Sequence, residues 1–173
     1  MTQEQVLKML REYHVNAGRC EYIEAEIRRL RQAAERLEPA FERDVTALPA
    51  CRPDGMPRGG APGRPTERIA AALADGEAFR QSEYGREARR IAEQIEALKR
   101  ELEEKRLIVQ YVDSWLKALT ERERCVIERH LIEHEIWYDI AGTFKSRFSD
   151  EITTGRLKRL QQQALRKIYA IAG

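Results

Sequence analysis

The sequence has few of the residues that define disulfide-rich or membrane-spanning proteins. Its three cysteines, Cys20, Cys51 and Cys125, are far apart, odd in number and without C-x-x-C spacing. This pattern argues against a disulfide framework or a cysteine zinc site, and favours thiols in a reducing compartment. The first residues lack a basic start followed by an apolar run, and no stretch approaches the roughly 18 apolar residues that span a bilayer. We therefore expect a soluble, cytoplasmic protein without a membrane partner.

Proline is scarce outside one short segment. Five of the six prolines and four of the ten glycines fall between residues 49 and 65. Such a stretch cannot hold a helix and packs poorly, so the residues at about 48–65 are predicted to form a mobile loop. Its arginines (Arg52, Arg58 and Arg64) can contact a polyanion, or the segment can simply be a solvated linker.

Charged residues are abundant, and they favour helices. They make up 35% of the 173 residues against 7% for aromatics, a composition typical of long solvated helices rather than of a sheet protein. Residues 145–173 carry seven basic side chains and two acidic ones, a balance of +5, whereas the other 144 residues balance at −3. A basic C-terminal segment suggests a polyanion-binding end, although solvated lysine and arginine side chains explain the charge equally well.

Apolar residues recur in steps of four and three on either side of the proline-rich segment. They are Ile23, Ile27, Leu30, Ala34, Leu37 and Phe41, then Tyr84, Ala88, Ile91, Ile95, Leu98, Leu102, Val109, Val112, Leu116 and Leu119, interrupted at Lys105. This periodicity predicts helices packed along a seam. Either residues 19–47 fold back against 84–118, or the helices pair across a homodimer. A shorter first helix, over residues 2–16, is predicted to end with Gly18 as a left-handed cap.

Three short helices are predicted after residue 119. Thr120-Glu121-Arg122-Glu123 forms a capping box, so the first of these helices begins at Glu121. The second contains Ile136, Trp137, Ile140 and Phe144. Thr153 caps the third, whose apolar stripe is Leu157, Leu160, Ala164, Ile168 and Ile171. Three short helices that end in a basic one suggest a helix-turn-helix unit.

Two blocks of this region resemble region four of bacterial sigma factors. They are "LTERERCVIERHLIEHEIWYDIA", from Leu119 to Ala141, and "ITTGRLKRLQQQALRKI", from Ile152 to Ile168, and together they cover about a quarter of the chain. The whole layout resembles that of ArpU/RinA-type regulators of phage late transcription. Those proteins combine a helical N-terminal part, a Pro/Gly stretch leading into a Pro-Thr-Glu helix start (here Pro65-Thr66-Glu67) and a sigma-like C-terminus with Trp before Ile-Ala.

The resemblance implies an all-α, sequence-specific DNA-binding regulator of phage or prophage type, which works in a bacterial cell without catalysis, cofactor or metal ion. Residues 1–118 would form a helical arm that dimerises the protein or presents a surface to RNA polymerase. Residues 119–173 would form the helix-turn-helix domain that binds double-stranded DNA. The predicted DNA-contacting residues are Thr153, Thr154, Arg156, Lys158, Arg159 and Gln162 of the last helix, with Lys145 and Arg147 before it.

The sequence departs from the sigma pattern at two places. "KSRFSD", after Phe144, adds six residues to a turn that sigma factors keep tight. It forms either a longer loop that reaches phosphates through Lys145 and Arg147 or a neutral surface insertion. Thr154 and Gly155 stand where primary sigma factors have an Arg-Glu pair, so the promoter preference of those factors cannot be transferred.

The segment "ERHLIEHE", residues 128–135, contains H-x-x-E-H, the signature of inverted zinc metallopeptidases. Aligned with the sigma pattern, His134 falls at a turn glycine, so His130 and His134 would straddle a helix end. A zinc peptidase needs both imidazoles on one face of a continuous helix and a third protein ligand. We therefore interpret the match as accidental. The remaining alternative is a small-terminase-like DNA-packaging subunit, which also combines a helix-turn-helix with coiled-coil oligomerisation.

Several side chains have a structural interpretation beside a functional one. Trp115 and Trp137 are expected in the core. Arg156 can face phosphate or pair with Asp150. Arg166 and Lys167 can contact DNA or interact with the C-terminal end of the last helix dipole.

Overall fold

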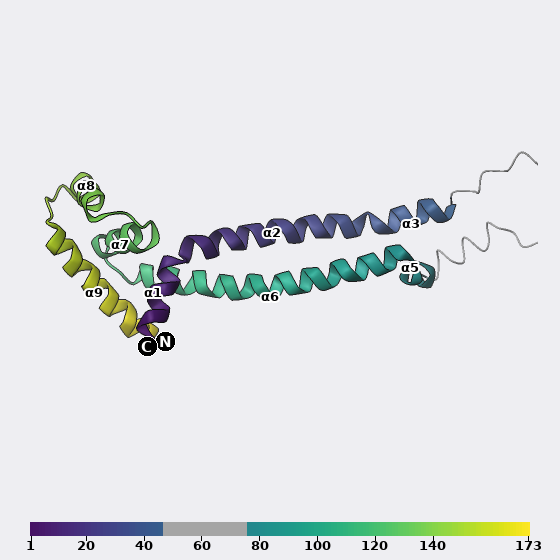
Figure 1. Ribbon diagram of the computed structural model, residues 1–173, viewed down its shortest axis with the longest axis horizontal. Coiled ribbons are helices and arrows are strands. Elements are labelled where there is room, and N and C mark those ends of the chain that lie inside the picture. The colour runs from purple at the N-terminus through teal and green to yellow at the C-terminus, as the bar shows by residue number, and fades with distance from the viewer. Residues whose placement is uncertain (47–75) are drawn as a thin grey trace, which may run out of the picture. The chain divides into compact units, whose positions relative to one another are not determined.

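The computed structural model describes residues 1–46 and 76–173, and these residues form helices without a strand (Figure 1). The predicted all-α class is therefore confirmed for the described part of the chain. The predicted loop at about 48–65, its three arginines, Cys51 and the helix start at Pro65 lie outside the described residues. None of the described helices is long and apolar enough to cross a membrane.

The helices fall into two compact units. Before residue 47 they are α1 (Gln3–Arg11), α2 (Tyr13–Glu35) and α3 (Leu37–Thr46); after residue 75 they are α5 (Glu77–Gln81), α6 (Glu83–Lys117), α7 (Glu121–Ile127), the π-helical turn η1 (Glu128–Ile132), α8 (Trp137–Phe148) and α9 (Thr154–Ala172). Unit 1 contains residues 1–22 and 101–173, and unit 2 contains residues 23–100. Helices α2 and α6 contribute residues to both units.

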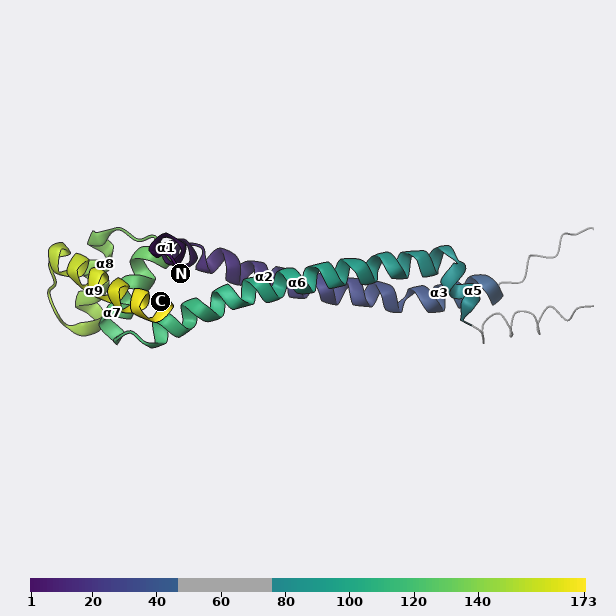
Figure 2. The same ribbon diagram turned by 90° about the horizontal axis from the view of Figure 1, so that it is seen from below.

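In unit 2 part of the predicted seam is buried within a single chain, and the rest of it, including Ile95 and Leu98, is half-buried. Helices α2 and α3 run alongside α6 in the opposite direction (Figures 1 and 2). Ile23, Ile27, Leu30, Phe41 and Ile91 are each at most 8% exposed. Of the two arrangements that the periodicity allows, the isolated chain adopts the antiparallel fold-back.

Two residues explain where the helices of unit 2 break. Pro39 lacks a backbone N–H, and its ring would clash with the carbonyl group of Glu35, so α2 ends at Glu35 and α3 begins at Leu37. Gly85 is buried near the start of α6, where a Cβ atom would lie 2.1 Å from the carbonyl oxygen of Phe79. The missing side chain therefore lets the end of α5 approach the first turn of α6.

The prediction that the first helix covers residues 2–16 and ends at Gly18 is wrong. Helix α1 ends at Arg11, and α2 continues from Tyr13 through Gly18. A glycine inside a helix costs about 1 kcal/mol, but Asn16 and Cys20 on either side of it are buried. Packing along one face of α2 therefore outweighs the cost of the glycine.

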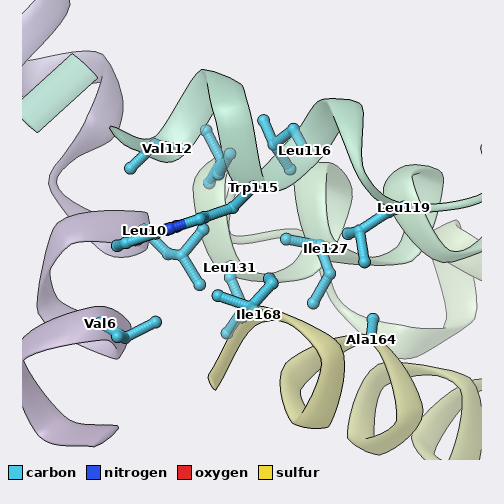
Figure 3. Close-up of a cluster of buried hydrophobic side chains, with 11 residues drawn as sticks. Val6, Leu10, Val112, Trp115, Leu116, Leu119, Ile127, Leu131, Ala164 and Ile168 are labelled. Carbon is cyan, nitrogen blue, oxygen red and sulfur yellow. The ribbon is translucent and has the colours of Figure 1, made fainter. Parts of the chain in front are cut away.

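The core of unit 1 contains residues from both the first and the last helix of the chain. Val6 and Leu10 of α1, Trp115 of α6 and Ile168 of α9 are each at most 2% exposed and lie in one cluster (Figure 3). The other members are Val112, Leu116, Leu119, Ile127, Leu131, Ile132 and Ala164. The expected burial of Trp115 is confirmed. Helix α1, which the sequence analysis placed in the arm, packs in the same unit as α7, η1 and α9.

A second cluster lies between α7, α8 and α9, and we call it the three-helix cluster. It contains Cys125, Val126, Ile140, Phe144 and Leu157. Burial raises the pKa of the Cys125 thiol. Because one side chain or more comes from each of the three helices, this cluster sets how α9 is held against α7 and α8.

The predicted helix starts in this region are confirmed. The Thr120 backbone N–H donates to Glu123 Oε2 (3.0 Å), and the Glu123 N–H donates to Thr120 Oγ1 (3.4 Å), which completes the capping box of α7. The Arg156 N–H donates to Thr153 Oγ1 (3.4 Å) at the start of α9. Local capping chemistry therefore determines where α7 and α9 begin.

Candidate nucleic-acid interface

Helix α9 is buried along one face and exposed along the other. Leu157, Ala164 and Ile168 of the predicted apolar stripe are fully buried, and Leu160 is half-buried. Ile171, the last residue assigned to the stripe, is 53% exposed, whereas its neighbour Ala172 packs against the core of unit 1. The six predicted DNA-contacting residues of this segment, Thr153, Thr154, Arg156, Lys158, Arg159 and Gln162, are all exposed.

The basic side chains around α9 divide into those with an acidic partner and those without. Lys145 pairs with Glu151, Arg147 with Glu121 (3.0 Å), Arg122 with Asp150 (3.2 Å) and Lys167 with Glu123 (2.8 Å). By contrast, Arg156, Lys158, Arg159 and Arg166 form no ion pair with any described residue. The unneutralised positive charge of this region therefore lies on the exposed face of α9.

Two of these ion pairs bear on alternatives that the sequence left open. Asp150 pairs with Arg122 on α7, so the suggested pair between Arg156 and Asp150 is not formed. Lys167 reaches across to Glu123 of α7 and so ties α9 to α7. Neither contact carried a sequence signal, because each joins residues that are far apart in the chain.

The six-residue insertion does not form the predicted loop. Lys145, Arg147 and Phe148 belong to the last turn of α8, and residues 149–153 connect α8 to α9. The helix continues because Phe148 packs on the buried Phe144, with ring centroids 4.6 Å apart. The Arg122 guanidinium also lies 5.6 Å from the Phe148 ring. Lys145 and Arg147 therefore stand on a helix, each paired with a carboxylate.

A small cavity beside α9 is lined in part by Arg122, which was not among the predicted DNA-contacting residues. It has a volume of about 320 Å³ and is lined by Arg122, Ile152, Arg156, Arg159, Leu160 and Gln163. Arg122 comes from the first turn of α7, and nothing in its local sequence places it next to α9. Three guanidinium groups therefore lie around one cavity beside α9.

The H-x-x-E-H residues are not arranged as a zinc peptidase requires. His134 follows the end of η1 with a left-handed backbone (φ 58°), as a turn glycine would. The His130 Nδ1 atom lies 3.0 Å from the carbonyl oxygen of Glu135. The two imidazoles therefore do not share one face of a continuous helix. The described residues contain no group of three or more metal-ligating side chains near one another.

Trp137 is in the core only in part. It is half-buried and packs against the three-helix cluster, so part of its indole ring remains accessible. The expectation that both tryptophans are core residues thus holds fully for Trp115 and partly for Trp137.

Comparisons with known proteins give no relative from which a role could be transferred. No family model matches the sequence, and no curated protein or solved structure matches it.

Proposed function

We propose that this chain is a sequence-specific DNA-binding protein, a transcriptional regulator of phage or prophage type. In this proposal α8, residues 149–153 and α9 form a helix-turn-helix unit that resembles sigma region four, and α9 enters the major groove of double-stranded DNA. The arrangement supports the proposal because α7 and α8 hold α9 from one side through the three-helix cluster. The opposite side of α9 is exposed in the part of the chain that the structure describes, so it could lie in a groove.

The observation that carries the proposal is the set of exposed cations on α9 that have no acidic partner among the described residues. Arg156, Lys158 and Arg159 lie within one helical turn, beside a helix N-terminus capped by Thr153. Lysine and arginine that neutralise phosphates release counterions, which supplies most of the sequence-independent affinity for DNA. A cation that is already paired with a carboxylate must first lose that partner, so the α9 set is better suited to bind phosphates.

The residues of this surface would have different roles. The N–H groups at Thr153 and Thr154 and the side chain of Arg156 would hold phosphates near the helix N-terminus. Lys158, Arg159 and Gln162 would meet base edges or phosphates further along the groove. Lys145 and Arg147 would add phosphate contacts after releasing Glu151 and Glu121. The helical hairpin of unit 2 would serve dimerisation or present a surface to RNA polymerase.

Selection of bound sequences from a random DNA pool tests the proposal directly. We expect a defined motif and a monomer or dimer in sedimentation analysis. Binding that is indifferent to sequence, together with a ring of eight or more subunits, would instead indicate a packaging subunit. Absence of DNA binding at low salt would contradict both.

A pair of double variants tests which cations read the sequence. Lys158→Ala with Arg159→Ala should abolish preference for the selected motif, since a lost base contact costs about 1–3 kcal/mol and a lost phosphate contact lowers the salt slope by roughly one. Lys145→Ala with Arg147→Ala removes the same charge and is the matched control. It should weaken all DNA sequences similarly and retain the preference. The reverse result would place recognition at the end of α8 instead of on α9.

A further inference from the structure

Lys158 of α9 rests against the ring of Trp137, the first residue of α8. Its Nζ atom lies 5.9 Å from the ring centroid, within the roughly 6 Å over which an aromatic face attracts a cation. Trp137 packs against the three-helix cluster, whereas Lys158 is exposed. The ring is thus held by the core while the ammonium group remains accessible.

His130 of η1 also contacts the Trp137 ring. The two ring centroids are 3.9 Å apart and the planes are inclined by 34°. The imidazole is itself oriented by the backbone, because its Nδ1 atom lies 3.0 Å from the Glu135 carbonyl oxygen. A carbonyl oxygen can only accept, so Nδ1 carries the hydrogen in this contact. Contacts from η1 and the core therefore fix the ring on which Lys158 rests.

We infer that Trp137 is a positioning residue for Lys158 in DNA binding, an inference that rests on the proposed function. A free lysine side chain has four rotatable bonds, and ordering it opposes association. The ring contact restricts those rotamers before DNA arrives and leaves the ammonium N–H donors available to a phosphate or a guanine edge. Arg159 is the natural comparison, because it is adjacent, equally charged and has no aromatic contact with any described residue.

The test is a double-variant cycle on affinity for the selected DNA site, measured with labelled DNA by fluorescence anisotropy. Trp137→Leu keeps an apolar side chain but removes the aromatic face, and should weaken binding by about two- to fivefold. In the Lys158→Ala background the same change should have almost no further effect. In the Arg159→Ala background it should keep its full effect. Trp137→Phe, which retains an aromatic face, should restore most of the affinity.

The contact has a second readout that needs no DNA. The ε-methylene protons of Lys158 should be shifted upfield in the nuclear magnetic resonance spectrum by the indole ring current, and Trp137→Leu should remove the shift. If the wild-type protein binds the selected site and the two substitutions Trp137→Leu and Lys158→Ala weaken binding additively, this inference alone is overturned. A wild-type protein that binds no DNA would overturn the proposed function, and the inference with it.

Discussion

His134 and Ser149 hold left-handed backbone conformations at the ends of η1 and α8, with φ values of 58° and 52°. A side chain in this region brings Cβ too close to the following carbonyl oxygen, which costs roughly 1–2 kcal/mol. The position of His134 makes the chain reverse before α8 begins. The His134 side chain is exposed and has no hydrogen bond or ion pair with a described residue, so we expect glycine to suit this turn better.

We expect His134→Gly to raise the free energy of unfolding by about 0.5–1 kcal/mol, because relief of the left-handed strain exceeds the extra entropy that glycine loses on folding. Urea denaturation followed by tryptophan fluorescence measures this. Glu133→Gly is the adjacent control, since Glu133 has an ordinary φ of −90°, and it should destabilise the protein. A less stable His134→Gly variant would show that the imidazole makes a contact that matters.

At the scale of elements, Glu123 connects α7 to α9. Its carboxylate is buried, accepts from the Thr120 backbone and hydroxyl groups at 3.0 and 2.8 Å, and lies 2.8 Å from Lys167 Nζ. Burial acts to raise the pKa of this carboxyl, but Lys167 and Thr120 together hold it below its ordinary value. One side chain thus completes a capping box and also an ion pair between two helices.

This lowered pKa of Glu123 predicts a pH dependence of stability. Because the folded-state pKa is lower than the unfolded value of about 4.3, the stabilisation is fully present above that pH and is lost as the pH falls through the folded pKa. Thermal melts between pH 6 and pH 3 should therefore show a smaller decrease for Glu123→Gln than for the wild type. Glutamine still completes a capping box, so this variant isolates the charge. Equal decreases would mean that Lys167 does not stabilise the carboxylate.

At the scale of the whole molecule, both tryptophans belong to unit 1, whereas helical residues occur in both units. Tryptophan fluorescence therefore reports on unit 1, and circular dichroism reports on all helices. Helix α1 belongs to unit 1 through the buried Val6 and Leu10. Its packing makes the first residues of the chain part of the unit that holds α9.

Two matched substitutions test whether the two units unfold independently. Val6→Asp and Ile27→Asp each place an unpaired carboxylate in a buried apolar site, at a cost of several kcal/mol. Val6→Asp should alter tryptophan emission and lower the melting temperature seen by fluorescence. Ile27→Asp, in unit 2, should reduce helicity while tryptophan emission stays close to that of the wild type. If both variants changed both signals equally, the two units would unfold as one.

Much of the fold was predictable because the sequence signals for its helix starts and buried faces are local or periodic. The capping box of α7, the seam from Ile23 to Phe41 and the buried face of α9 each follow from residues within a few turns of one another. The errors arose where packing overrides a local preference. Gly18 remains helical because its neighbours are buried, and Lys145 to Phe148 extend α8 because Phe148 packs on Phe144.

The candidate site shows the same division. From sequence alone one could determine the all-α class, the starts of α7 and α9, and which face of α9 is exposed, since these depend on spacing along a single helix. Only the tertiary structure decided which cations lack an acidic partner among the described residues, that Arg122 lies beside α9, and that Lys158 contacts the Trp137 ring. The physical reason is that an ion pair or ring contact needs two side chains within a few ångströms of each other, and helix packing alone brings together residues that are far apart in the chain.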